Sequence, residues 1–165
     1  MLSSRLSFTK SDNITLRNYS VYSIYVDDDG KAAGGSTILR DSILHSYVNL
    51  DTDLQAVAVC ISLDKTITLC SVLLPPNSLH SLAQLKNLAD QLPTPFIIVD
   101  DFNEHNPLWD SKTTNDKGKK MEDLISQEGL GIFNNGTDTY LHPGNGSYSA
   151  IDLTVADPSL LLEFS

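Results

Sequence analysis

The chain has little cysteine, little basic charge and no long apolar segment. Only two of its 165 residues are cysteine, Cys60 and Cys70, too few for a disulfide framework or a cysteine-based zinc site. No run of about 18 apolar residues is present, which excludes a conventional membrane-spanning helix. The first residues also lack the apolar core of a secretory signal. We therefore expect an intracellular, reduced protein that is not embedded in a membrane.

Lys and Arg number 11 against 21 Asp and Glu, so the formal net charge is −10 and the pI is about 4.5. This balance argues against a basic nucleic-acid-binding module, because such modules bind mainly by neutralising phosphates with Lys and Arg. It leaves open an enzyme that meets phosphates through a divalent cation, since the bound ion inverts the local field. The more common meaning of such a charge is a soluble acidic surface.

The apolar pattern predicts one α+β domain with a real core. Turns are expected at 27–30 and 34–35. Strands are expected over residues 19–26, 36–39, 56–63, 66–74, 96–99, 130–133 and 148–155.

The strands at 56–63 and 66–74 predict a hairpin. Large residues face large ones if Leu63 lies opposite Ile67, which implies a three-residue loop. This register also puts Cys60 opposite Cys70, and we expect both to be free thiols.

Two helices are predicted from apolar spacing. The first is capped by Asn77 or Ser78, and its core stripe comprises Leu79, Leu82, Leu85, Leu88 and Leu92. The second begins at a capping Asp116 and ends at Gly129, with Met121, Leu124 and Ile125 facing the core.

The stretch from Pro95 to His105 is the most informative for function. A buried strand ends abruptly at Asp100 and Asp101, followed closely by Asn103. Asp101 can orient a water molecule or hold a hard cation, and Asn103 can hydrogen-bond a phosphate oxygen. An ordinary turn is the alternative, since Asp and Asn favour turns for local backbone reasons.

Several motifs, in order, make the chain resemble the endonuclease domain of non-long-terminal-repeat retrotransposons, in the endonuclease/exonuclease/phosphatase superfamily. The block Asp101-Phe102-Asn103, with His105, Pro107 and Trp109 after it, looks like the family's Gly-Asp-Phe-Asn block. The other matching segments are Leu54–Val59, Cys70–Asn77, Asn115–Gly118, Gly129–Asn134 with Thr139, and Ser149–Leu153.

This resemblance implies a four-layer β-sandwich flanked by helices, deoxyribonuclease-like, with residues 1–165 forming a single, incomplete domain. It implies Mg²⁺-assisted hydrolysis of DNA phosphodiester bonds. Asp101 would orient the attacking water and serve as a weak metal ligand, and Asp152 would fix a catalytic histidine. Asn103 would be a further catalytic residue that binds the phosphate, and Ser149 would bind substrate. We expect a monomer, which would be nuclear if it belongs to a functional retroelement.

The chain also departs from the family pattern. Ser3 stands where the family's metal-binding Glu belongs, Leu73 replaces a Tyr and Asp100 replaces a Gly. The chain stops before the family's Ser-Asp-His motif, and its own histidines (His45, His80, His105 and His142) are expected to be solvated or in loops. Trp109 is expected to pack under a loop, unless its ring is exposed for base stacking.

We therefore expect a truncated domain that is inactive as written. The alternatives are a non-catalytic remnant or binding domain, and a phosphomonoesterase of the same superfamily.

Overall fold

The computed structural model describes residues 15–24, 26–28, 31–33, 36–74, 80–101, 106–109, 114–134, 137, 140–141, 148–149 and 152–161. Their strands are β1 (Tyr19–Ser23), β2 (Val26–Asp28), β3 (Lys31–Ala33), β4 (Ser36–Arg40), β5 (Leu44–Val48), β6 (Gln55–Ser62), β7 (Thr66–Leu73), β8 (Phe96–Asp101), β9 (Gly131–Ile132), β10 (Tyr140–Leu141), β11 (Tyr148–Ser149) and β12 (Asp152–Ala156). The helices are α1 (Leu82–Gln91), α2 (Asp116–Glu128) and the short α3 (Pro158–Leu161), with a 3₁₀ turn at Pro107–Trp109.

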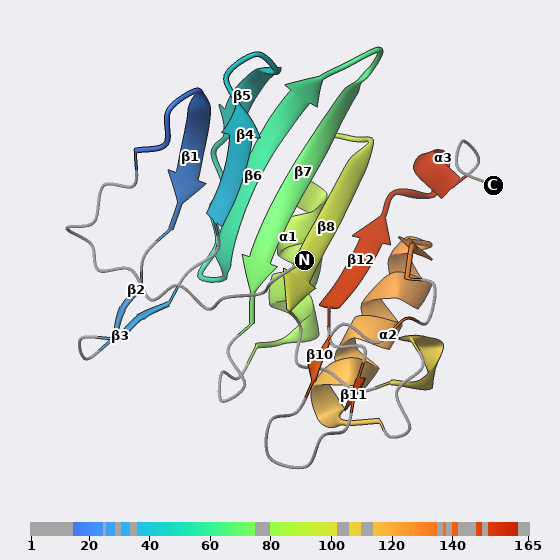
Figure 1. The fold of residues 1–165 in the computed structure, drawn as a ribbon. Helices are drawn as coiled ribbons and strands as arrows, with labels where there is room; N and C mark the ends of the chain where they lie inside the picture. Colours follow the sequence, from blue (N-terminus) through green and yellow to red (C-terminus); the bar gives the residue numbers. More distant parts are fainter. Residues whose placement is uncertain are drawn as a thin grey trace.

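A six-stranded mixed sheet organises the molecule, with the strand order β5-β6-β7-β8-β12-β9 (Figure 1). The β7–β8 pair is parallel, because α1 connects these strands as a crossover. The other pairs in this sheet are antiparallel. Three two-stranded sheets accompany it: β1-β4, β2-β3 and β10-β11.

Both faces of this sheet are covered in its middle. On β6, Ala58 and Val59 are adjacent, point to opposite faces and are both fully buried. The helices α1 and α2 cover one face, and β4 packs over β6 on the other through Thr37 and Leu39 (Figure 1). The α+β class is therefore confirmed, and the described residues form three of the four layers expected of the sandwich.

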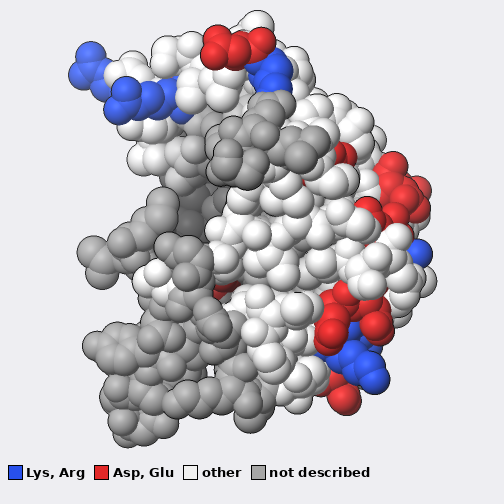
Figure 2. Space-filling model, turned by 90° about the vertical axis from the view of Figure 1, so that its right-hand side faces the viewer, with Lys and Arg blue, Asp and Glu red and all other residues white. Residues whose placement is uncertain are grey.

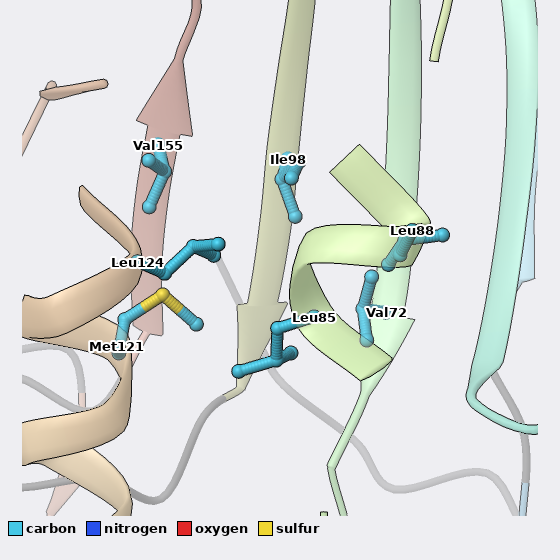
Figure 3. Close-up of a pocket in the computed structure, with 7 residues that line it drawn as sticks. All are labelled: Val72, Leu85, Leu88, Ile98, Met121, Leu124 and Val155. Atoms are coloured by element: carbon cyan, nitrogen blue, oxygen red, sulfur yellow. The ribbon is translucent and has the colours of Figure 1, made fainter. Parts of the chain in front are cut away.

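The main core fills the space between the large sheet and the helices (Figure 3). Of the first predicted stripe, Leu85, Leu88 and Leu92 are buried, Leu82 packs at the edge of the core, and Leu79 lies outside the described residues. The second stripe is confirmed, since Met121, Leu124 and Ile125 are buried. A small cavity of about 10 Å³ remains, lined only by apolar side chains: Val72, Leu85, Leu88, Ile98, Met121, Leu124 and Val155. A water molecule there would have no polar partner, so we expect the cavity to be dry.

Both long helices begin one or more residues away from the predicted cap. Ser81, and not Asn77 or Ser78, caps α1. Its hydroxyl accepts a hydrogen bond from the Gln84 N–H, and the side-chain oxygen of Gln84 accepts one from the Ser81 N–H. Asn115, not Asp116, caps α2 by accepting from the Gly118 N–H at 2.7 Å. Asp116 instead supplies negative charge in the first turn. Gly129 ends α2 at φ 65°, as predicted.

The hairpin register differs from the prediction by two residues. Ile61, not Leu63, lies opposite Ile67, so Cys60 faces Thr68 and Cys70 faces Ala58. The two cysteines remain on one face of the sheet as diagonal neighbours, because a shift of two residues preserves the face. Leu63 lies at the tip of the hairpin and is 62% exposed, and it does not face Ile67 as predicted.

The strand predictions also erred in places. Asp27 and Asp28, expected in a turn, belong to β2, while Gly34 and Gly35 lie outside the described residues. The strand expected over 148–155 is divided into β11 and β12, and that over 130–133 is reduced to β9. The strands β3, β5 and β10 were not predicted, since their short segments show no clear alternation of apolar residues.

The two thiols should differ in reactivity. Neither cysteine is in a disulfide, and Cys70 is buried while Cys60 is only partly so. We expect Ellman's reagent to find two thiols in denaturant and, in the folded protein, to modify Cys60 well before Cys70. A Cys60→Ser variant should remove the faster phase. Titration of no thiol under non-reducing conditions would contradict this assignment.

Asn115→Ala should destabilise the protein by about 0.5–2 kcal/mol, because it removes the cap of α2. Thermal melting should show a loss of several degrees. Gln127→Ala, an exposed change on the same helix, serves as the control and should leave the melting temperature nearly unchanged.

Candidate active site

Asp101 and Asp152 lie directly opposite each other on neighbouring strands. Asp101 is the last residue of β8 and Asp152 is the first residue of β12, and the antiparallel register pairs them. A single strand pairing thus brings together two acidic residues that are distant in the sequence. This is the edge of the sheet where the resemblance expects the active site.

The backbone hydrogen bonds show which kind of pair this is. Asp152 and Thr154 direct their backbone groups away from β8: Asn134 donates to the Asp152 carbonyl, and the Phe133 N–H donates to the Thr154 carbonyl. Since bonding alternates along a strand, Leu153 and Val155 bond to β8. Asp101–Asp152 is therefore a non-hydrogen-bonded pair, the type in which Cα atoms approach to about 4.5 Å.

Asn134 secures the outer side of this strand end. Its Nδ2 donates to the Asp152 carbonyl at 2.6 Å, and its Oδ1 accepts from the Thr154 N–H at 2.8 Å. The regular ladder between β9 and β12 covers only the Ile132–Val155 and Gly131–Ala156 pairs. The side-chain amide of Asn134 thus forms hydrogen bonds with the backbone of β12 beyond the end of the ladder.

Asn106 anchors the chain that follows the Asp-Phe-Asn block. It is buried, and its Nδ2 donates to Glu122 Oε2 at 2.8 Å and to the Gly118 carbonyl at 3.3 Å. Its Oδ1 accepts from the Leu108 N–H at 2.9 Å. One side chain therefore joins the 3₁₀ turn to α2.

The structure describes only some of the other expected site residues. Asn103 and His105 lie outside the described residues. Ser149 ends β11, where it pairs with Tyr140. Leu73, which stands where the family has Tyr, ends β7 opposite Gln55 and is half-buried. The structure therefore brings together Asp101 and Asp152, and the roles assigned to all four site residues remain predictions.

Two predictions about rings are decided by burial. Trp109 is only 2% exposed, so it packs beneath the surface and the base-stacking alternative is wrong. His80 lies in a loop, one of the two settings expected for the histidines, but it is 3% exposed and so it is not solvated. Its segment is fixed to α2, because Lys120 Nζ donates to the His80 carbonyl at 2.8 Å. His45 is half-buried against Tyr22, with the ring centroids 5.6 Å apart.

The surface charge gives DNA no broad basic platform on the face that Figure 2 shows. Patches of Asp and Glu are separated there by uncharged surface, and the described Lys and Arg residues form no continuous band. Within the described ranges, no group of three His, Cys, Asp or Glu side chains is arranged to hold a metal ion. The described helices include none that is long and apolar enough to cross a membrane.

The fold is that of a deoxyribonuclease-like endonuclease domain. The structure is similar to the endonuclease domain of TRAS1, a telomere-specific non-LTR retrotransposon, with a TM-score of 0.71 and 21% identity over 88% of this chain and 70% of that chain. At this identity, the similarity is evidence for the fold.

The family model described as endonuclease-reverse transcriptase matches residues 67–163, more than half of the chain, and the chain belongs to this family. It is also 26% identical over 161 residues to the RNA-directed DNA polymerase from mobile element jockey of Drosophila funebris. That match covers 95% of this chain and 18% of the relative, so the chain spans less than a fifth of that protein. The recognition of a retrotransposon endonuclease domain is therefore confirmed. The family implies a nucleic acid substrate and, in general, dependence on a metal.

Sequence reasoning identified the two acids but not the amides that support them. In the sequence, Asn134 stands out only as the end of a segment that matches the family. Asn106, between His105 and Pro107, carries no signal of its own. The available signal was an Asn directly beside an apolar or aromatic segment, which is too common to indicate a buried amide. Their partners are distant in the sequence, so only the fold reveals these bonds.

Asn106→Ala should lower the free energy of unfolding by about 1–3 kcal/mol, because it removes three hydrogen bonds and leaves buried partners unsatisfied. Urea unfolding would measure the change. Asn87→Ala is the matched control, since Asn87 is exposed and its side chain bonds only within α1. Equal effects of the two substitutions would contradict the anchoring role of Asn106.

Proposed function

We propose that this chain is the endonuclease domain of a non-long-terminal-repeat retroelement, with hydrolysis of DNA phosphodiester bonds as its chemistry. The observation that carries the proposal is the pairing of Asp101 with Asp152 at one edge of the central sheet. Opposed acids on adjacent strands repel each other and weaken the sheet. Their retention in a close pair is explained if a cation binds there.

The residue types at this edge suit Mg²⁺. The family's site residues present here are Asp101, Asn103, Ser149 and Asp152, all with oxygen ligands, which hard cations prefer. When bound, the ion would polarise a phosphoryl oxygen and assist formation of the nucleophile. Asp101 would hold the ion and orient the attacking water, while Asn103 and Ser149 would bind the phosphate. Asp152 would orient a general acid or base beside them.

We further propose that catalysis by this chain is weak. Ser3 occupies the position at which the resemblance expects the metal-binding Glu, and a hydroxyl supplies no negative charge to a divalent cation. Leu73 lacks the phenolic group expected near the phosphate, and Asp100 adds a charge and bulk where the family has Gly. A monomer acting on nuclear DNA is the corresponding biological setting.

The purified chain should nick supercoiled plasmid in Mg²⁺ no faster than an Asp101→Ala variant, because one paired acid cannot replace the lost charge of the glutamate. Restoring that charge with Ser3→Glu should raise the nicking rate, and Asp101→Ala should abolish the gain. Asp64→Ala, an exposed acid in the hairpin loop, is the control and should have no effect.

Three other outcomes would change the proposal. Robust nicking by the unmodified chain, abolished by Asp101→Ala, would show that another acid replaces the glutamate. DNA binding without nicking, even in the Ser3→Glu variant, would favour a binding domain. Hydrolysis of p-nitrophenyl phosphate without plasmid nicking would favour a phosphomonoesterase.

A further inference from the structure

We propose that Asn134 is a positioning residue that holds Asp152 opposite Asp101. The inference rests on the proposed function, because the position of Asp152 matters only if this edge of the sheet is the site. Asn134 contacts the backbone of β12, so it would act through Asp152 and not on the substrate itself.

The first step of the argument is that the strand end needs support. Asp152 is the first residue of β12, and its pair with Asp101 contains no backbone hydrogen bond. An acidic pair favours the strand pairing less than an apolar pair such as Val155–Ile98 does, because like charges placed opposite each other are destabilising.

The second step is that Asn134 supplies support on the other side. Its amide donates to the Asp152 carbonyl at 2.6 Å and accepts from the Thr154 N–H at 2.8 Å. Two bonds to positions two residues apart fix both the location and the rotation of the backbone between them. The neighbouring Phe133 N–H, bonded to the Thr154 carbonyl at 2.9 Å, fixes Asn134 itself.

The third step concerns the chemistry of the side chain. An amide offers a donor and an acceptor on one rigid planar group, as a peptide bond does. Asp lacks the donor and would direct a carboxylate at a carbonyl oxygen. Leu has the same number of side-chain heavy atoms and the same branching without either group, so Asn134→Leu removes both bonds and keeps a side chain of similar outline. Gln retains the amide on a longer stem.

The test uses Mn²⁺ as a probe of the site, followed by NMR. Mn²⁺ should broaden the backbone amide signals of Asp101 and Asp152 in the unmodified chain. In Asn134→Leu, the concentration needed for this broadening should rise about 10–100-fold, because Asp152 would move away from the cation held at Asp101 and groups outside the ligand set contribute this much to metal affinity. The Thr154 amide should exchange with solvent at least about tenfold faster, because it has lost its acceptor. Asn134→Gln should recover part of both losses.

Two controls separate positioning from general stability. Ser81→Ala removes the cap of α1, far along the chain from β12, and should lower the melting temperature without changing Mn²⁺ broadening. Asn87→Leu changes an exposed Asn to the same residue type and should alter neither measurement. All variants are compared at a temperature where each retains the dispersed amide spectrum of the folded state.

Each result decides between the alternatives. Unchanged broadening and unchanged Thr154 exchange in Asn134→Leu would overturn the positioning role. An equal loss of Mn²⁺ affinity in Ser81→Ala would reduce that role to general stability. If the unmodified chain shows no broadening, the cation site of the proposed function is wrong, and the role of Asn134 is tested without the metal. Faster Thr154 exchange in Asn134→Leu, together with shifted Asp101 and Asp152 signals, would then support positioning. Unchanged exchange and unchanged signals would overturn it.

Discussion

The pairing of β8 with β12 is the contact on which the rest of the structure depends. It joins the part of the sheet built around the β6–β7 hairpin to the strands that follow α2, and it closes the core beneath both helices. The same pairing sets Asp101 opposite Asp152. A slip of one residue would move Leu153 and Val155 out of the core and the acidic pair out of register, so packing fixes the geometry of the site.

The energetics of this strand end are finely balanced. Cross-strand pairs in a sheet contribute about 0.2–1 kcal/mol, and like charges directly opposite are destabilising, while each net hydrogen bond contributes about 0.5–1.5 kcal/mol. The two bonds of Asn134 are therefore large enough to offset an unfavourable Asp101–Asp152 pair. This accounts for a half-buried Asn two residues beyond β9.

The elements with strong periodicity were predictable, and those decided by distant contacts were not. The Leu stripe of α1 and the strand before Asp101 have patterns that few other structures satisfy. The caps were missed because several residues of capping type stand near the start of each helix, Asn77, Ser78 and Ser81 at α1 and Asn115 and Asp116 at α2, and only the backbone conformation selects among them. The hairpin register was wrong because side-chain size alone was used, whereas burial of the small Ala58 beside Cys70 decides it. The support from Asn106 and Asn134 depends on tertiary bonds that leave no local pattern.

The acidic composition and the acidic pair present the same electrostatic difficulty at different scales. A chain of net charge −10 repels a DNA backbone over a distance limited by salt screening. Under the proposed function, the Asp101–Asp152 edge would add a short-range repulsion where a phosphate approaches. A divalent cation bound there would relieve both, since it would pair with the carboxylates and attract the phosphate. Binding of the ion and binding of DNA would then be coupled, and a serine in place of a glutamate ligand, as the resemblance implies for Ser3, would weaken both together.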